Sequence, residues 1–395
     1  MNAPMNAPMN TIARISEFHA ELTAWRRDLH AHPELGFEET RTADLVAQRL
    51  EQFGIEVHRG VGRTGVVGVL RNGSAKKAIG LRADMDALPI DETNGFDHRS
   101  QHKGRMHACG HDGHTTMLLG AARYLAQTRN FDGTVHFIFQ PAEEGLGGAQ
   151  AMIADGLFRR FPCDVLFGMH NRPKLAVGRF NVRAGPMMAG GAFFDIDVTG
   201  VGAHGARPET GVDAVMVGVQ IASTLQTIVS RNVRPVDTAV LSITQFHAGD
   251  AYNVIPQTAR LSGTVRAFSK DVMALVEQNM RRVADGVAAS MGASARVDFR
   301  VNFAPLVNDP EQAEFAAAIC AELVGADKVD RAPALVMASE DFSYMLEQVP
   351  GCFINIGNGD AEGGCEVHNP AYDFNDAAIP LGASFFARAV ERYLA

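Results

Sequence analysis

Strand and helix patterns alternate along the first half of this chain, and this alternation limits the possible folds more than any other feature. Short runs rich in β-branched and aromatic residues are separated by segments whose apolar residues recur at helical spacing. The predicted strands are 65–70, 78–85, 134–140 and 164–170, and the predicted helices are 42–53, 111–126 and 148–158. Such alternation predicts an α/β fold with a mostly parallel central sheet, whose functional side chains gather at the carboxyl ends of its strands.

The pattern changes near Gly185. Two long helices and several alternating strands then fit a small α+β sandwich, with the helices on one face of an antiparallel sheet. The predicted strands there are 192–199, 239–246 and 260–268, and the helices are 213–230 and 270–291. From about residue 300 the α/β pattern returns, with helices at 310–324 and 380–393 and a strand at 352–356. We predict a flexible tail at 1–10, a first domain made of 11–184 and 300–395, and an inserted domain at 185–299.

Composition excludes several classes of protein. The 395 residues are 46% hydrophobic, which is enough for packed cores, and the formal net charge is -9. An acidic chain has no basic surface for nucleic acid or for an anionic membrane. The most apolar helix, 214–229, is interrupted by Gln220, Thr224 and Gln226 and falls short of the roughly 18 clean residues of a membrane span. We predict a soluble protein that acts on a small molecule.

The amino terminus and the cysteines bear on location. The opening MNAPMNAPMN has neither the basic start nor the apolar core of a signal peptide. The five cysteines are an odd number and widely spaced, which favours free thiols in a reducing compartment. We therefore expect a cytoplasmic protein.

Two segments match the GxGxxG pattern of dinucleotide-binding proteins, 60–65 and 200–205. The first runs directly into a strand pattern, and Pro208 follows the second before any helix begins. Both are therefore interpreted as tight turns. No GxSxG motif occurs, so a serine hydrolase has no support either.

The densest cluster of reactive side chains is MHACGHDGH at 106–114, in a predicted loop that enters a helix. It contains three histidines and Cys109, and these residue types are the preferred ligands of zinc-like ions. The alternative is a surface loop whose polar groups cap the helix.

Adjacent carboxylates, Glu143 and Glu144, follow the strand predicted at 134–140. Neighbouring residues of an extended segment point in opposite directions, so one carboxylate could bind a metal while the other faces a water molecule. Such a carboxylate can take a proton from that water and pass it to a leaving amine. The alternative is a solvated acidic turn.

Three further residues are candidates by position. His170 closes one predicted strand, His368 lies at a similar strand end, and Asp84 lies near the end of the strand at 78–85. Each alone could be structural, but parallel strand ends could bring all three to one crevice.

Here the sequence resembles the M20 metallopeptidase family, and specifically its amidohydrolase branch of hippurate hydrolases, N-acyl amino acid amidohydrolases and indoleacetyl-amino-acid hydrolases. The resemblance extends from about Ile15 to the carboxyl terminus, and it implies a zinc-peptidase-like catalytic domain. The segments that carry it, in order, are WRRDLHAHPE (25–34), LRADMDALP (81–89), MHACGHDGH (106–114), QPAEEG (140–145), GAHG (202–205), ASEDF (338–342) and VHNP (367–370).

The resemblance implies a divalent metal centre of one or two ions, with Glu143 as the general base. The implied metal ligands are Cys109, His111, Glu144, His170 and His368. The wider family places a histidine two residues before the position of Asp84, but this chain has Arg82 there. Asp84 is then a candidate for orienting a ligand. Thiolate and imidazole suit zinc, and manganese, cobalt and nickel remain open.

The resemblance also makes the inserted segment a lid and dimerisation domain, so that we expect a homodimer or a homotetramer. His204 would stabilise the developing oxyanion in a partner's active site. Asn253 and Arg266 would contact the substrate carboxylate, which a guanidinium can engage through parallel donors. A capping asparagine and a strand-surface arginine are the alternatives for these two residues.

The predicted function is metal-dependent hydrolysis of the amide bond of an N-acyl amino acid, of the hippurate or N-acetyl amino acid type. One alternative is an M20-type dipeptidase or aminopeptidase that prefers a free amino terminus. A second is a non-catalytic metal-dependent binding protein.

Overall fold

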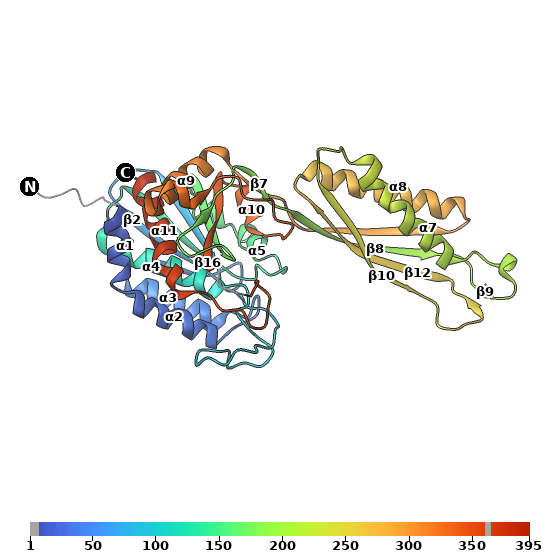
Figure 1. Ribbon diagram of the computed structural model, residues 1–395, viewed down its shortest axis with the longest axis horizontal. Helices are drawn as coiled ribbons and strands as arrows, with labels where there is room; N and C mark the ends of the chain where they lie inside the picture. Colours follow the sequence, from blue (N-terminus) through green and yellow to red (C-terminus); the bar gives the residue numbers. More distant parts are fainter. Residues whose placement is uncertain (1–7, 360–364) are drawn as a thin grey trace, which may run out of the picture. The chain divides into compact units, whose positions relative to one another are not determined.

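The computed structural model describes residues 8–359 and 365–395, and the chain divides into two compact units (Figure 1). Unit 1 comprises the chain to Gly185 with Val307–Ala334 and Asp341–Ala395, and unit 2 comprises Pro186–Leu306 with Leu335–Glu340. The boundary predicted after residue 299 falls inside strand β13 (Ser294–Phe303), whose pairing with β8 (Gly190–Thr199) continues to Phe303. The return of 335–340 to unit 2 was not predicted, because it depends on a bridge between Met188 and Val336.

Unit 1 contains an eight-stranded sheet in the order β1-β2-β4-β3-β5-β16-β6-β15. Its strands are β1 (Glu56–Val61), β2 (Gly65–Asn72), β3 (Ala78–Asp84), β4 (Gly133–Gln140), β5 (Val165–Pro173), β6 (Phe180–Asn181), β15 (Val329–Asp330) and β16 (Gly351–Gly359). The four central strands β4, β3, β5 and β16 are parallel, which confirms the expected fold class. Every residue of β3 is buried, as expected for a central parallel strand.

The outer strands on one side are antiparallel. β1 and β2 form a hairpin, and the first GxGxxG segment is its turn, with Gly60 and Gly62 at positive φ. The sheet is therefore mixed, and the interpretation of this motif as a turn is confirmed.

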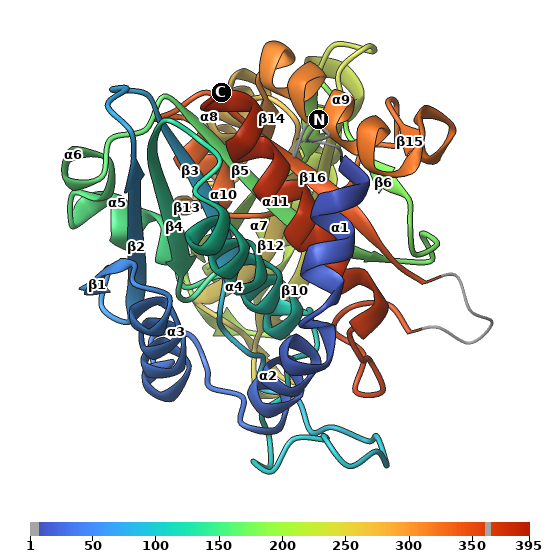
Figure 2. The ribbon, with the colours of Figure 1, turned by 90° about the vertical axis from the view of Figure 1, so that its left-hand side faces the viewer.

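The helices of unit 1 cover the sheet (Figure 2). They are α1 (Pro8–Ser16), α2 (His19–Ala31), α3 (Thr40–Gln52), α4 (His111–Thr128), α5 (Gly148–Ala154), α6 (Leu157–Arg160), α9 (Pro310–Val324), η3 (Ala326–Lys328), α10 (Phe342–Leu346), η4 (Asp376–Ala378) and α11 (Ile379–Tyr393). α4, α9 and α11 contribute to one apolar core together with Leu81 and Ala83 of β3. Arg82 lies between these two residues and points to the opposite face, where its guanidinium is 5.4 Å from the ring of Phe342 in α10.

Two predicted segments of unit 1 need correction. The tail predicted at 1–10 is too long: residues 1–7 lie outside the described residues, and α1 begins at Pro8 because Thr11 and Ile15 are buried. The single helix predicted at 148–158 is two helices, since Gly156 adopts a φ of 85° between α5 and α6.

Unit 2 has its own core. Its four-stranded sheet has the order β10-β12-β8-β13, and all its pairs are antiparallel. Its elements besides β8 and β13 are β9 (Ala203–His204), η1 (Pro208–Thr210), α7 (Ala214–Thr227), the π-helical turn η2 (Ile228–Asn232), β10 (Ala239–Ala248), β11 (Val254–Ile255), β12 (Thr258–Ala267) and α8 (Lys270–Ser290). The apolar sides of α7 and α8 pack on one face of this sheet (Figure 1). Short strands β7 (Gly185–Met188) and β14 (Leu306–Asn308) lie where the chain leaves and re-enters unit 1.

Within the described residues, no helix has the length and apolar character that crossing a membrane requires. All five cysteines are described, and each has a free thiol.

Candidate metal centre

The predicted metal ligands meet at the carboxyl ends of three neighbouring strands, β4, β3 and β5. β3 ends at Asp84, β4 ends three residues before Glu143, and α4 begins at His111. Two positions differ from the prediction. His170 lies within β5 rather than at its end, and His368 lies in a turn rather than at a strand end.

All five predicted ligands belong to overlapping groups whose ligand atoms lie within 4.8 Å of one another. One group is Cys109, His111 and His170, and a second is Cys109, Glu144 and His368. Cys109 Sγ is 3.3 Å from His170 Nε2, and Glu144 Oε1 is 3.1 Å from His368 Nε2. A third group adds Glu143 beside His111 and Glu144. The cluster therefore contains the ligand types of a zinc-like ion with a further carboxylate next to them.

Hydrogen bonds orient the imidazole rings of His170 and His111. His170 Nδ1 donates to the carbonyl oxygen of Asn171 (2.6 Å), and His111 Nδ1 donates to Asp86 (3.2 Å), so the neutral form of each ring has its lone pair on Nε2. His111 Nε2 is buried without a hydrogen-bond partner among the described residues. Buried polar atoms are normally satisfied, so His111 Nε2 fits the coordination of an ion.

The electrostatics of the pocket favour positive charge. Burial and the charges of Glu144 and Glu143 raise the pKa of the Cys109 thiol well above its usual value. Burial opposes protonation of His111, but the carboxylates of Asp84 and Asp86 outweigh it and raise its pKa to about 10. A divalent cation would compensate these carboxylates and allow the thiolate to form.

Gly110 determines how the chain passes from Cys109 to His111. Its φ is 91°, and an added Cβ would lie 2.4 Å from Asn171 Oδ1 and 2.7 Å from the hydroxyl oxygen of Tyr372. Only glycine fits both restrictions without displacing neighbours. α4 therefore begins directly at a predicted ligand, His111.

His368 is also held in an uncommon backbone conformation, with a φ of 66°. Its backbone N–H donates to the carbonyl oxygen of Ala108 (2.7 Å), which ties it to the residue before Cys109. Positive φ at a residue other than glycine costs free energy, and such strain clusters at functional sites.

Glu143 and Glu144 lie in a turn, so the prediction that they occupy an extended segment was wrong. Ala142 has a φ of 52° and reverses the chain after β4, while its N–H donates to the buried Glu39 (2.8 Å). Because of this reversal, both carboxylates face the cluster.

Asp84 is completely buried, and its shortest contact with a histidine is to His114, which is not a predicted ligand. Its Oδ1 is 2.6 Å from His114 Nδ1, and its Oδ2 accepts from Arg82 Nη1 (2.8 Å). His114 Nε2 in turn is 2.7 Å from Asn171 Oδ1, beside His170. Asp84 also lies 3.8 Å from His111 Nε2.

Unit 2 contains the three remaining predicted site residues. His204 is exposed in β9, and Asn253 adjoins it, because the N–H of Gly205 donates to the carbonyl oxygen of Asn253 (2.7 Å). Arg266 lies on β12, where it donates to Thr264 and to the carbonyl oxygen of Val265. Its guanidinium carbon is 5.8 Å from the centre of the Phe193 ring. Their functional roles remain predictions.

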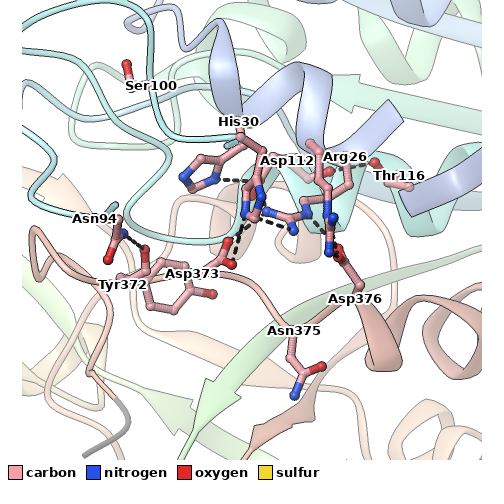
Figure 3. Close-up of polar contacts among 12 residues, drawn as sticks. Arg26, His30, Asn94, Ser100, Asp112, Thr116, Tyr372, Asp373, Asn375 and Asp376 are labelled. Atoms are coloured by element: carbon pink, nitrogen blue, oxygen red, sulfur yellow. Dashed lines mark hydrogen bonds and ion pairs between the residues drawn. The ribbon is translucent and has the colours of Figure 1, made fainter. Parts of the chain in front are cut away.

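An ionic network joins Arg26 and His30 of α2 to Asp112 of α4 (Figure 3), and it was not predicted from the sequence. His30 Nδ1 donates to Asp112 (2.8 Å), the residue after His111. Arg26 donates to Asp373 and Asp376 (both 2.7 Å) and lies 3.6 Å from Asp112. The one available signal is that Arg26 and His30 are four residues apart and so share a helix face.

Comparison with known proteins defines the class. Residues 80–392 match the model of Peptidase family M20/M25/M40. The hippurate hydrolase of Campylobacter jejuni is 42% identical over 386 residues, covering 98% of this chain and 100% of that protein. The N-acetyl-L-cysteine deacetylase of Bacillus subtilis is 38% identical over 381 residues, covering 96% and 90%.

A solved structure shows the same fold. The YXEP protein of Bacillus subtilis, described as a dinuclear metal binding peptidase from the M20 family, superposes with a TM-score of 0.84 at 36% identity, covering 96% of this chain and 99% of that chain. The chain belongs to Peptidase family M20/M25/M40. Within that family it is a metal-dependent amidohydrolase.

Proposed function

We propose that this protein hydrolyses the amide bond of N-acyl amino acids, of the hippurate or N-acetyl amino acid type, and releases a carboxylic acid and a free amino acid. The observation that carries the proposal is the cluster of Cys109, His111, Glu144, His170 and His368 with Glu143 beside it. Relatives similar over almost their whole length act on N-acylated amino acids, as their names state.

Glu143 is the proposed general base. It is 6% exposed, and its Oε1 accepts from the backbone N–H of Asp341 (3.3 Å). A divalent ion bound by the neighbouring ligands would supply a Lewis acid for the acyl carbonyl and make water a better nucleophile at neutral pH. Glu143 takes the proton of the attacking water and delivers it to the amide nitrogen as the carbon–nitrogen bond breaks.

Three residues of unit 2 complete the proposal. His204 stabilises the oxyanion of the tetrahedral intermediate in a partner's active site, while Asn253 and Arg266 bind the substrate carboxylate. Burial lowers the pKa of Arg266, but a guanidinium stays charged at neutral pH and can engage both carboxylate oxygens.

We further propose zinc as the ion, with one or two ions per chain, because thiolate and imidazole ligands suit zinc. Manganese, cobalt and nickel are the alternatives. Assembly into a homodimer or homotetramer is proposed through unit 2, whose edge strand β10 exposes Val240 and Phe246. Five free thiols support the proposed cytoplasmic location.

The test is an activity screen of protein reconstituted with zinc, manganese, cobalt or nickel. Hippurate, N-acetyl amino acids and dipeptides with a free amino terminus are compared by kcat/KM. We expect the acylated substrates to be preferred. A preference for free amino termini would indicate the dipeptidase alternative, and no turnover with any bound metal would indicate a binding protein.

A further inference from the structure

Arg26 is a buried cation that joins two parts of unit 1 that lie far apart in the sequence (Figure 3). It belongs to α2. Its Nε donates to Asp376 and its Nη1 donates to Asp373, each at 2.7 Å. Nη1 also lies 3.6 Å from Asp112 in the first turn of α4. One guanidinium therefore links the start of α4 to the chain that follows His368.

The chain around His368 has no regular structure of its own. Residues 365–375 contain neither a helix nor a strand, and η4 begins at Asp376. His368 has a φ of 66°, and its side chain is 51% exposed. A strained residue in an irregular segment keeps its position only when the surrounding contacts determine it. We call residues 365–376 the His368 segment.

Backbone hydrogen bonds hold the first half of the His368 segment. The N–H of His368 donates to the carbonyl oxygen of Ala108 (2.7 Å), and the N–H of Thr93 donates to the carbonyl oxygen of Pro370 (2.9 Å). Further along, the two carboxylates that bind Arg26 attach the segment to α2.

Arg26 is more buried than His98 and Arg27, which also contact these carboxylates. His98 is 3.0 Å from Asp373 and Arg27 is 2.9 Å from Asp376, and their side chains are 13% and 50% exposed. The side chain of Arg26 is 1% exposed. Exposed ion pairs contribute little, whereas removing one partner of a buried pair leaves the other charge uncompensated. Of these contacts, those of Arg26 therefore contribute most to holding the segment.

The start of α4 depends less on Arg26. Asp112 has a shorter contact with His30, whose Nδ1 donates to it at 2.8 Å, so this end keeps an anchor when Arg26 is replaced. The carboxylates of the His368 segment instead lose their most buried partner. Replacement of Arg26 should therefore displace the His368 segment and leave His111 in place.

His368 has to lie close to the other predicted ligands to share an ion with them. Its Nε2 is 3.1 Å from Oε1 of Glu144, and both residues form a ligand group with Cys109. We propose that Arg26 is a positioning residue that holds the His368 segment against α2 so that His368 completes this group. The inference rests on the ligand set of the proposed function. Its test is metal binding, which can be measured whether or not the protein hydrolyses N-acyl amino acids.

The test variant is Arg26→Gln, and the chain offers a matched control next to it. Arg26→Gln removes the charge and the parallel donors of the guanidinium, but it leaves a polar side chain in α2. Arg27→Gln is the control, because Arg27 is the next residue of α2 and contacts Asp376 from an exposed position.

The experiment is a titration of the metal-free full-length protein with Zn²⁺ in competition with a chromophoric chelator. The variant His368→Ala identifies the ion that His368 binds, because the affinity for that ion falls. We expect Arg26→Gln to weaken binding of the same ion by about 10–100-fold, as the loss of residues that orient ligands does. Arg27→Gln should bind zinc like the wild type.

A double-mutant cycle separates positioning from a general loss of stability. If Arg26 acts through His368, adding Arg26→Gln to His368→Ala should change the affinity for this ion by less than about twofold. Adding Arg26→Gln to His170→Ala should still weaken binding by the full factor, because His170 is held within β5. A general loss of stability would instead weaken binding further in both backgrounds.

Wild-type affinity in Arg26→Gln, or an equal further loss in both backgrounds, would overturn the proposal. If Arg26→Gln does not fold, the double variant Asp373→Asn/Asp376→Asn weakens the same contacts from the other side, and the same outcomes support or overturn the proposal. A wild-type protein that binds zinc but leaves N-acyl amino acids intact contradicts the proposed function alone.

Discussion

Glu143 and Glu144 are neighbours in sequence with different surroundings. The carboxylate of Glu144 lies near His368, and its backbone N–H is bound to Asp86. Glu143 instead accepts from the backbone N–H of Asp341, which comes from the other end of the chain. These contacts support a division of roles in which Glu144 is a ligand and Glu143 is a base.

The first prediction concerns Glu143→Gln. The amide cannot accept the proton of water, so we expect kcat to fall by about 10²–10⁴-fold. The five ligands are unchanged, so metal content measured by elemental analysis should stay at the wild-type level. Parental turnover of hippurate or N-acetylmethionine in this variant would refute the mechanism.

The second prediction concerns His30 and pH. Burial opposes its protonation, but the hydrogen bonds to Asp112 and Glu92 outweigh burial and raise its pKa from 6.5 to about 9. The folded state therefore binds this proton more tightly than the unfolded state. The resulting stability is fully present below pH 6.5 and is lost as pH rises to 9.

This contribution amounts to at most about 3 kcal/mol. It is measured as the free energy of unfolding in urea at several pH values between 6 and 9.5. In His30→Gln the free energy of unfolding should decline less as the pH rises. Equal slopes in the variant and the wild type would show that His30 does not carry the effect.

At the scale of elements, the loop 106–110 and the helix α4 place two ligands through a single glycine. We expect Gly110→Ala to lower stability by about 1–2 kcal/mol from the left-handed backbone alone. The collision with Asn171 and Tyr372 should also weaken metal binding, because Cys109 and His111 flank the site of change.

Gly104→Ala is the matched control for this third prediction. Gly104 has a φ of 74°, but nothing lies within 4 Å of an added Cβ. Gly104→Ala should lower the thermal unfolding temperature, because of its left-handed backbone, without a change in metal affinity. Equal metal affinity in both variants would contradict the assigned role of Gly110.

Elements with local signals were predictable from the sequence. α9 was predicted with its exact bounds, because Asp309 caps it, Pro310 occupies its first position and Gly325 follows it. The division of α5 from α6 was not predicted, since a single glycine inside a helical pattern does not reveal its φ.

The site was predictable only in part, because several of its residues contact partners that are distant in the sequence. The ligand set followed from the family resemblance, and the sheet order explains why the ligands converge. Asp86 and the pair Arg26 and His30 act on partners 25 to 350 residues away, so no spacing rule could identify them.

At the scale of the molecule, each unit has a separate apolar core, and all five predicted ligands belong to unit 1. An ion that binds only the folded state stabilises it, by about 2.7 kcal/mol when its concentration is 100 times its Kd. The fourth prediction is therefore that chelation destabilises unit 1 selectively.

Hydrogen exchange followed by mass spectrometry measures this effect. After EDTA treatment, amides around 106–114 and 140–148 should exchange faster, while amides of α7 and α8 in unit 2 should be unchanged. Re-addition of Zn²⁺ should restore protection. An equal loss of protection in both units would contradict the assignment of all ligands to unit 1.

The predicted ligands extend along the sequence from Cys109 to His368. A ribosome makes the chain from its amino terminus, so most of the coordinating atoms emerge long before His368. The full set of predicted ligands is therefore present only after His368 has been synthesised. A product that ends before His368 would lack one predicted ligand and also α11, whose buried side chains belong to the core of unit 1.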